Sequence, residues 1–326
     1  MNRPRLIALS GFMAALAVVV YLSTPPTLVN AAAIPELPAD IDAYLAASEE
    51  QVDERFHLIP NTGKRVRWQE PGVRTEFAIV YLHGFSATRQ ETAPLAEQIA
   101  DTLQANLFET RLTGHGHTEM PLHAVRAEDW LEDAAEALAI GERLGDKLIV
   151  IGTSTGGSLA LAMSDHEAAK TVSNIILLSP NIEPINSTSK WATRPGGYLI
   201  ARIVAGETRS WTPRNDLQER YWSTSYPTNA AIEMMRLVEL TQSKLPLNIH
   251  PNLLVILSPN DKVVSPVATK SAFEQITSPR KLLVEVQGSQ DPSNHVLAGD
   301  ILAPESTAKI AATVVDFIRP KGAAEL

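Results

Sequence analysis

One serine of this chain lies in a sequence context that suits covalent chemistry. Ser154 is at the centre of Gly152-Thr153-Ser154-Thr155-Gly156-Gly157, after an apolar run and before a helix-forming segment. A sharp turn from a strand into a helix projects a serine hydroxyl outward, and glycines two residues to either side let the backbone approach closely. The helix N-terminus favours negative charge that develops nearby. The pattern predicts that Ser154 is a nucleophile; the alternative is a serine in an ordinary glycine-rich turn.

A serine nucleophile needs a base that takes its proton and an acid that orients the base. When a serine follows such a strand–turn–helix unit, the acid and then the histidine come later in the chain, after later strands. Of the eight histidines, His295 is the one that follows these strands, in Ser293-Asn294-His295. His295 is therefore the predicted base, and the alternative is a polar loop residue.

Asp261 is the predicted acid. It follows the strand expected at 253–257 and is surrounded by turn-forming residues. An aspartate in this position can also close an Asx turn or cap a helix. Asp291 and Asp300 flank His295 and are the fallback candidates for the same role.

Two backbone N–H groups are candidates for binding the negative oxygen of a tetrahedral intermediate. One belongs to Thr155, the residue after the nucleophile. The second is that of Phe85, in the loop His83-Gly84-Phe85-Ser86 after the first buried strand. We interpret His83 as a structural histidine that supports this loop.

His115-Gly116-His117, with His123 nearby, has the composition of a zinc site. Glu119 is the only acid close in sequence, and a tight loop explains the glycines better. We therefore expect no metal and no other cofactor.

The elements that must position these residues alternate along the chain. Such alternation predicts a mostly parallel sheet covered by helices on both faces. Strands are expected at 55–59, 65–69, 77–82, 106–112, 147–152, 174–179, 253–257 and 281–287, and helices at 39–50, 93–103, 127–144, 156–169, 267–276 and 307–318.

The alternation is interrupted once, over about 181–250. A structureless loop of this length is uncommon, so we predict an insertion with helices of its own that forms a cap over the strand ends. Its aromatic residues are interpreted mainly as the core of the cap, with a subset free to form an apolar wall. They are Trp191, Trp211, Trp222, Tyr198, Tyr221 and Tyr226.

The first 33 residues have the parts of an export signal. Arg3 and Arg5 precede the uncharged, mainly apolar run 6–22, and Ala31-Ala32-Ala33 provides a cleavage site of the A-x-A type. The run is also just long enough to span a bilayer, so residues 1–33 are either a signal peptide or a membrane anchor. The domain at 34–326 is expected to be exported, and so periplasmic or secreted, or anchored to the membrane.

Charge and composition exclude several other functions. The 326 residues carry 28 Lys and Arg against 37 Asp and Glu, a net charge of −9, which disfavours nucleic acid as a partner. The absence of cysteine excludes thiol nucleophiles, thiolate metal sites and lipid attachment at an N-terminal cysteine. With 44% hydrophobic residues, the composition is that of a globular protein.

Taken in order, these motifs resemble the α/β-hydrolase superfamily, and within it the monoacylglycerol lipase and carboxylesterase branch that is often grouped with serine aminopeptidases. The resemblance extends from about Arg55 to Pro320, with two departures: Thr113 replaces a usual Pro, and Thr155 replaces a frequent Met or Gln. The motifs are Tyr81-Leu82-His83-Gly84-Phe85, Arg111-Leu112-Thr113-Gly114-His115-Gly116-His117, Gly152 to Gly157, Asn260-Asp261 and Asn294-His295-Val296.

The resemblance implies a doubly wound α/β-hydrolase sheet with a helical cap, and hydrolysis of carboxylic esters through an acyl-enzyme without a metal. The substrate would be a small ester, acyl or lipid-like. The alternative is an aminopeptidase or proline iminopeptidase-like enzyme on the same fold. The cap has 8 Lys and Arg against 6 Asp and Glu over 181–250, so it lacks the acidic excess that would bind a substrate amine. A catalytically inactive binding protein would not need the serine, base and acid together. The oligomeric state stays open.

Overall fold

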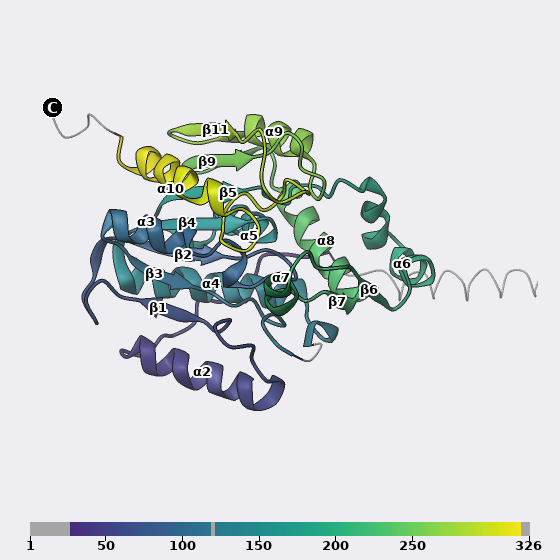
Figure 1. Ribbon diagram of the computed structural model, residues 1–326, viewed down its shortest axis with the longest axis horizontal. Coiled ribbons are helices and arrows are strands. Elements are labelled where there is room, and N and C mark those ends of the chain that lie inside the picture. The colour runs from purple at the N-terminus through teal and green to yellow at the C-terminus, as the bar shows by residue number, and fades with distance from the viewer. Residues whose placement is uncertain (1–26, 119–120, 321–326) are drawn as a thin grey trace, which may run out of the picture.

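The computed structural model describes residues 27–118 and 121–320, and its centre is a seven-stranded sheet (Figure 1). The strands are β1 (Arg65–Arg67), β2 (Thr75–Leu82), β3 (Asn106–Glu109), β4 (Gly145–Thr153), β5 (Val172–Leu178), β9 (Asn252–Leu257) and β11 (Lys281–Glu285). Their order across the sheet is β1-β3-β2-β4-β5-β9-β11. β1 is antiparallel to β3 and every other neighbouring pair is parallel. The predicted mostly parallel sheet is confirmed.

Helices cover both faces of the sheet (Figure 1). Val80 and Leu82 of β2 point into the core under one helical layer, whereas Ile79 and Tyr81 point into the core under the other. This alternation is the period of two that a strand imposes on its side chains. The first layer contains α2 (Ile41–Phe56), α4 (Ala127–Leu144), α5 (Thr155–Ala162), α8 (Thr228–Ser243) and α9 (Pro266–Gln275), and the second contains α3 (Leu95–Leu103) and α10 (Pro304–Ile318).

Local sequence explains where several of these helices begin. Asp40 caps α2 by accepting a hydrogen bond from the backbone N–H of Ala43 at 2.9 Å. Ser265 caps α9 through its side chain, and Pro266 follows at the first helical position, where a missing N–H costs nothing.

Between β5 and β9 the chain leaves the sheet, within the 181–250 segment. Two short strands, β6 (Thr208–Ser210) and β7 (Ser225–Pro227), pair antiparallel, and β8 (Leu247–Asn248) pairs in parallel with β10 (Ile276–Thr277). The pattern of the sequence predicts helices here but not these short strands. The elements are η4 (Ser187–Thr193), α6 (Gly197–Ala205), β6 (Thr208–Ser210), α7 (Asp216–Tyr221), β7 (Ser225–Pro227), α8 and β8 (Leu247–Asn248). The remaining short helices of the described chain are η1 (Arg89–Glu91), η2 (Pro121–His123) and η3 (Glu167–Ala169).

Two predicted elements are wrong in part. The strand expected at 55–59 is absent, because α2 continues to Phe56 and ends in a left-handed cap at His57; Leu58 makes only an isolated bridge with His117. Five residues of alternating polarity are too few to distinguish a strand from the end of a helix. The helix expected at 156–169 ends at Ala162, and η3 follows after a short turn.

The apolar run 6–22 of the predicted leader lies outside the described residues. Residues 27–33 are described and have no regular secondary structure. Within 27–118 and 121–320, we find no helix with the length and hydropathy that crossing a bilayer requires.

Candidate active site

The predicted site residues come together at one edge of the sheet. Ser154 directly follows β4, Asp261 follows β9, His295 follows β11 and Phe85 follows β2. Because these strands are parallel, their carboxyl ends lie at the same edge. A cavity of about 350 Å³ opens there, and it is lined by Ser154, Thr155, Phe85 and His295 among others.

Ser154 occupies a sharp turn that only its glycine neighbours permit. Its φ of 51° and ψ of −113° are unusual for a residue with a side chain, and its N–H donates to the carbonyl of Leu178 at 2.9 Å. A Cβ on Gly156 would lie 2.0 Å from the carbonyl oxygen of Leu82, and a Cβ on Gly152 would lie 2.5 Å from that of Gly156. The two glycines therefore let β4 and α5 meet closely enough to force Ser154 into this conformation.

His295 and Asp261 form a hydrogen-bonded pair. His295 Nδ1 lies 2.8 Å from Asp261 Oδ2, and both residues are buried. The other carboxylate oxygen, Oδ1, accepts the backbone N–H groups of Val263 at 2.8 Å and Val264 at 3.0 Å. Asp261 is thus fixed by its own loop and orients the imidazole, with Nδ1 as the donor and Nε2 left for another partner.

Asp291, a fallback candidate for the acid, contacts the backbone of the histidine loop. Its Oδ2 accepts the N–H groups of His295 at 3.1 Å and Val296 at 3.0 Å. Arg214, from the 181–250 segment, places its Nε 3.3 Å from Oδ1 of Asp291. Asp291 therefore positions the loop that carries His295, whereas Asp261 contacts the ring. Asp300, the other fallback candidate, makes a different contact: its backbone N–H donates to the carbonyl of Ala93 at 2.9 Å.

The pKa of His295 is raised above its ordinary value. Burial alone would lower this pKa, but the hydrogen bond that His295 Nδ1 donates to Asp261 and the negative charges of Asp261, Glu91 and Asp291 outweigh burial. An imidazole in these surroundings is stabilised as it becomes positively charged, which is what a base requires when it takes a proton.

The loop after β2 presents one N–H group to the cavity. The N–H of Gly84 donates to Glu91 Oε2 at 2.8 Å, and the N–H of Ser86 donates to His115 Nε2 at 3.0 Å. Between them, the N–H of Phe85 has no acceptor among residues 27–118 and 121–320. Phe85 lines the cavity, and its N–H is the one of these three that has no acceptor in the described parts of the chain.

Two neutral histidines support this loop from behind. His83 Nε2 accepts the N–H of Leu112 at 3.0 Å and its Nδ1 contacts the carbonyl of Gly84 at 2.9 Å. Burial lowers the pKa of His83 well below its ordinary value and lowers the pKa of His115 to about 4. Both rings can therefore accept a backbone N–H at Nε2 while Nδ1 keeps its proton. The structure agrees with a structural role for His83.

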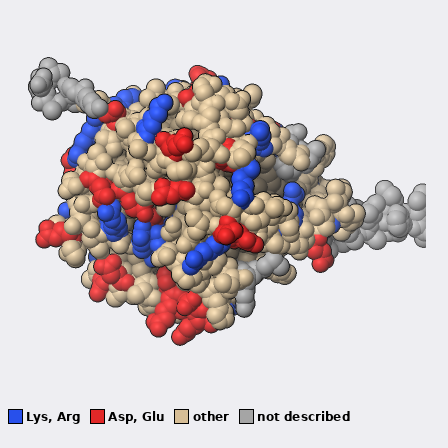
Figure 2. Space-filling model, viewed as in Figure 1, with Lys and Arg blue, Asp and Glu red and all other residues tan. Residues whose placement is uncertain are grey.

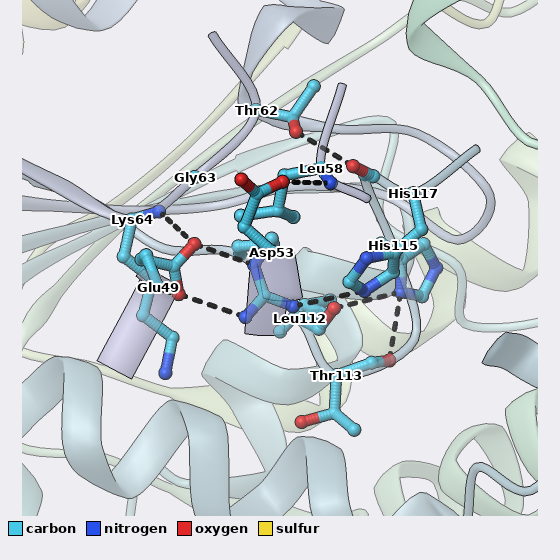
Figure 3. Close-up of polar contacts among 12 residues, drawn as sticks. Glu49, Asp53, Leu58, Thr62, Gly63, Lys64, Leu112, Thr113, His115 and His117 are labelled. Carbon is cyan, nitrogen blue, oxygen red and sulfur yellow. Dashed lines mark hydrogen bonds and ion pairs between the residues drawn. The ribbon is translucent and has the colours of Figure 1, made fainter. Parts of the chain in front are cut away.

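The same support extends to the N-terminal helix (Figure 3). The guanidinium of Arg111 donates from Nε to Glu49 Oε2 at 2.8 Å and from Nη2 to Glu49 Oε1 at 2.9 Å. Its Nη1 lies 3.4 Å from His117 Nε2, and burial together with the Arg111 charge lowers the pKa of His117 to about 3. Thr62 Oγ1 donates to the carbonyl of Gly116 at 2.9 Å. Contacts of α2 thus fix the loop at 111–117 that supports the Phe85 loop.

Replacing Glu49 by glutamine is expected to destabilise the fold by about 3–5 kcal/mol, because it leaves the buried Arg111 guanidinium without its carboxylate. Thermal unfolding followed by circular dichroism measures this. Glu54→Gln, an exposed site on the same helix, is the matched control and should change stability by less than about 0.5 kcal/mol. Equal effects of the two substitutions would contradict the role of the ion pair.

Glu91 is a site residue that sequence reasoning missed. It is buried, lines the cavity and bonds the Gly84 N–H, and a Cβ on Gly84 would lie 2.8 Å from its Oε1. Burial raises the pKa of Glu91 to about 7, against the lowering effect of the Gly84 hydrogen bond and of His295. It lies nine residues beyond the end of β2, and no local motif distinguishes it in the sequence.

Replacing Glu91 by glutamine is expected to move the acid limb of the pH–kcat/KM profile to lower pH. The neutral form of His295 is the active base, so activity falls as pH drops through the pKa of His295. Glu91, whose own pKa is about 7, carries part of its charge in this range, and that charge contributes to raising the pKa of His295, so removing it lowers the pKa of His295. Glu132→Gln, at an exposed site on α4, is the control and should leave the limb unchanged. An unshifted limb in the Glu91 variant would show that its charge does not act on His295.

The cavity wall opposite the sheet comes from the 181–250 segment. Trp211, Trp222, Tyr226 and Met234 line it, and the ring of Phe85 packs edge-on against Tyr226 with centroids 4.9 Å apart. Trp211, Trp222 and Tyr226 are therefore the subset of the six aromatic residues that can form an apolar wall, although the pattern of the sequence does not indicate which side chains face the cavity. Trp191 is exposed instead.

Two buried oxygen atoms in this cavity have no hydrogen-bond partner. They are Thr155 Oγ1 and Asn181 Oδ1, and both residues line the cavity. A buried acceptor left without a donor costs free energy, so the two atoms mark places in the pocket where a hydrogen-bond donor would be stabilised.

His115, one of the histidines considered as a metal site, is engaged at both ring nitrogens. His115 accepts an N–H at Nε2, and its Nδ1 faces the carbonyls of Leu112 and Thr113, each at 3.2 Å. In the described parts of the chain, no group of three or more His, Asp or Glu side chains has the arrangement of a metal site.

The parallel sheet, the strained serine after its central strand and the acid–histidine pair at the same edge define an α/β-hydrolase. Residues 74–290, more than half of the chain, match the family described as serine aminopeptidase, S33. The chain belongs to that family, and the resemblance drawn from the motifs is confirmed.

Individual relatives agree with this assignment. The chain is 26% identical to a thermostable monoacylglycerol lipase of Bacillus sp. (strain H-257) over 211 residues, which are 65% of this chain and 81% of the relative. A structure from work on the metagenome-derived lipolytic enzymes LipS and LipT superposes with a TM-score of 0.66 at 22% identity, covering 81% of this chain and all of the other. A monoacylglycerol lipase of Paleococcus ferrophilus gives a TM-score of 0.60 at 16% identity over 78% and 97% of the two chains.

Proposed function

We propose that this protein hydrolyses carboxylic esters through an acyl-enzyme, with Ser154 as nucleophile, His295 as base and Asp261 as orienting acid. The observation that carries the proposal is the convergence of the strained Ser154 and the His295–Asp261 pair on one cavity. The similarity to a monoacylglycerol lipase supports an ester as the substrate.

In the proposed reaction, His295 Nε2 takes the proton of Ser154 Oγ while Oγ attacks the ester carbonyl carbon. The oxygen becomes negative in the tetrahedral intermediate and is stabilised by the backbone N–H groups of Phe85 and Thr155. His295 then gives its proton to the leaving alcohol, and the acyl group stays on Ser154. Water attacks the acyl-enzyme by the same route, which releases the acid and restores the serine.

The cavity favours an acyl ester over a peptide. We propose that the 181–250 segment is a cap whose aromatic side chains receive the acyl chain. An aminopeptidase needs a free carboxylate for the substrate amine, and the acids that line the cavity are Glu91 and Asp291. Glu91 accepts the Gly84 N–H, and Asp291 accepts backbone N–H groups and pairs with Arg214. Neither is free for an amine.

The test is a panel of substrates: p-nitrophenyl esters from acetate to palmitate, monoacylglycerols and aminoacyl-naphthylamides. We expect turnover of the esters and none of the naphthylamides. Faster cleavage of an aminoacyl-naphthylamide than of every ester would assign the protein to the peptidases instead. Absence of turnover with the whole panel would favour a binding protein on this fold.

The unpaired oxygens of Thr155 and Asn181 suit an alcohol that still carries hydroxyl groups, as the glycerol of a monoacylglycerol does. Replacing Asn181 by leucine removes one acceptor and is expected to lower kcat/KM for a monoacylglycerol by roughly tenfold relative to the p-nitrophenyl ester of the same acyl chain. An equal change for both substrates would contradict recognition of the glycerol by this side chain.

The N-terminal sequence supports a location outside the cytoplasm, by export or by anchoring through residues 6–22. Cell fractionation of the full chain tests this: recovery from the cytosol would contradict it.

A further inference from the structure

Helix α6 carries an apolar face that the rest of the described chain leaves uncovered. It lies at one extremity of the molecule, within the 181–250 segment (Figure 1). The exposed fraction of its large apolar side chains rises from 43% for Leu199 to 80% for Val204, with Ile200 and Ile203 between these values. Trp191, in the preceding η4, is 72% exposed. A cluster of exposed apolar side chains of this size marks a surface that contacts another apolar phase.

The segment that follows the apolar run 6–22 is packed onto the domain. Leu28 is only 5% exposed and belongs to the core of the first helical layer. Asn30 Nδ2 donates to the carbonyl of Ala162 at 3.0 Å, and His166 Nε2 lies 3.0 Å from the carbonyl oxygen of Ala32. Cleavage after Ala33 would remove Leu28, Asn30 and Ala32 from these contacts. The packing therefore favours a mature chain that keeps its N-terminal segment.

This segment enters the domain beside α6. Thr27 and Leu28 line a surface hollow of about 580 Å³ together with Lys190 and Arg194 of the η4 region. The η4 helix leads directly into α6, whose first residue, Gly197, bonds back to the carbonyl of Arg194 at 2.7 Å. Leu22, the end of the apolar run, is five residues before Thr27, a reach of at most about 18 Å. If the run lies in a bilayer, α6 must be close to the membrane surface.

The charge around α6 complements an anionic membrane. Residues 185–209 contain four basic residues and a single acid, Glu207, in a chain whose net charge is −9; Lys190 also pairs with Glu183, and Arg202 pairs with Glu207. Acidic side chains gather instead at the lower edge of the molecule, over α2 (Figure 2). Trp191 and Tyr198 are side chains that favour the membrane interface. The basic residues are Lys190, Arg194, Arg202 and Arg209.

We propose that residues 1–33 are retained as a membrane anchor and that α6, with Trp191, docks onto the surface of an anionic lipid bilayer. The chain passes from α6 through β6 to Trp211, which lines the active-site cavity. Docking thus places the cavity near esters that are dissolved in the membrane. This last consequence rests on the proposed ester hydrolysis, whereas the docking itself does not.

The absence of cysteine makes the test direct, because a single introduced cysteine is the only labelling site. Full-length Ile203→Cys and Val204→Cys, labelled with an environment-sensitive fluorophore, are placed in vesicles of phosphatidylcholine and phosphatidylglycerol that contain spin-labelled lipid quenchers. The matched control is Val267→Cys on α9, which is 77% exposed. We expect blue-shifted, quenched emission at positions 203 and 204 and neither effect at 267. Emission at 203 and 204 like that at 267 would overturn the docking.

Two further measurements separate the parts of the proposal. The intact mass of protein isolated from membranes should be that of the full 35.4 kDa chain, and a chain that begins at Ile34 would overturn retention of the anchor. A different outcome is that the labels at 203 and 204 are shielded in detergent as the protein concentration rises, and are not quenched by spin-labelled lipid in vesicles. That result would assign the apolar face to a second copy of this chain and would also overturn the docking.

A charge substitution links docking to turnover. The double variant Ile203→Glu and Val204→Glu should lose most activity on a long-chain monoacylglycerol in vesicles and keep its rate on soluble p-nitrophenyl acetate. Val267→Glu is the control and should keep both. Full activity of the double variant on vesicles would overturn delivery through α6. If the unmodified protein cleaves no ester, the proposed function fails, while the labelling result still decides the docking.

Discussion

Replacing Ser154 by alanine is expected to abolish covalent labelling by a fluorophosphonate probe and to lower kcat for p-nitrophenyl acetate by about a millionfold, the size of effect known for loss of a serine nucleophile. The reason is that the substitution removes the hydroxyl that His295 would activate, while the neighbouring hydroxyl, Thr155 Oγ1, is buried at the start of α5. Mass spectrometry of the probe adduct measures the labelling, and steady-state hydrolysis of p-nitrophenyl acetate measures kcat.

The matched control is Ser158→Ala, one turn further along α5. Ser158 Oγ donates to the carbonyl of Asn181 at 2.7 Å, away from the cavity lining. This variant should keep the probe adduct, and both variants should keep the far-ultraviolet circular dichroism of the parent. An adduct that persists at full stoichiometry in Ser154→Ala would sink the nucleophile assignment.

The nucleophile turn could be predicted from sequence because its determinants are local. Gly152, Ser154 and Gly156 lie within five residues, and the two glycines are required by contacts that the strand–turn–helix geometry itself produces. The same holds for the sheet, since buried parallel strands are read as continuous apolar runs such as Phe77 to Leu82. His295 and Asp261 could be placed because chain order restricts the choice.

The residues that support the site could not be predicted in the same way. Glu91 acts on Gly84 and His295 through contacts that exist only after folding, and a glutamate in a polar loop has no distinctive neighbours in the sequence. The pairing of Glu49 with Arg111 joins residues 62 positions apart on a helix and a loop. Such pairs are fixed by tertiary packing, which a periodicity along one segment does not encode.

The choice between Asp261 and Asp291 shows where proximity in sequence misleads. Asp291 is only four residues from His295, yet it contacts the backbone N–H of His295 and not the ring. Asp261 is 34 residues away and contacts the ring. A loop that turns back on itself brings the nearby carboxylate under the main chain. The two acids therefore support the same histidine at different atoms.

Replacing Asp261 by asparagine is expected to lower kcat by about 10⁴, as in serine triads generally, while the stability of the fold changes little. An asparagine still offers an oxygen to the N–H groups of Val263 and Val264, but its amide cannot accept a proton shared with Nδ1 and stabilise the positively charged imidazole. Thermal unfolding and kcat for p-nitrophenyl acetate, measured together, report both effects.

Asp291→Asn should give the opposite pattern. The carboxylate of Asp291 pairs with Arg214. Burial would raise its pKa, but the hydrogen bonds from the Ser293 hydroxyl and from backbone N–H groups of the histidine loop hold this pKa below its ordinary value. The asparagine oxygen can still accept the N–H groups of His295 and Val296, but its NH2 group then faces the Ser293 N–H and Arg214. Losing these two contacts is expected to cost about 1–3 kcal/mol of stability and to reduce kcat far less than the change at Asp261. A greater loss of kcat from Asp291→Asn than from Asp261→Asn, at equal fractions of folded protein, would transfer the role of orienting acid to Asp291. Asp261→Asn changes the contact with the imidazole ring, whereas Asp291→Asn changes contacts with the main chain. The loss of kcat relative to the loss of thermal stability therefore identifies which carboxylate orients the base.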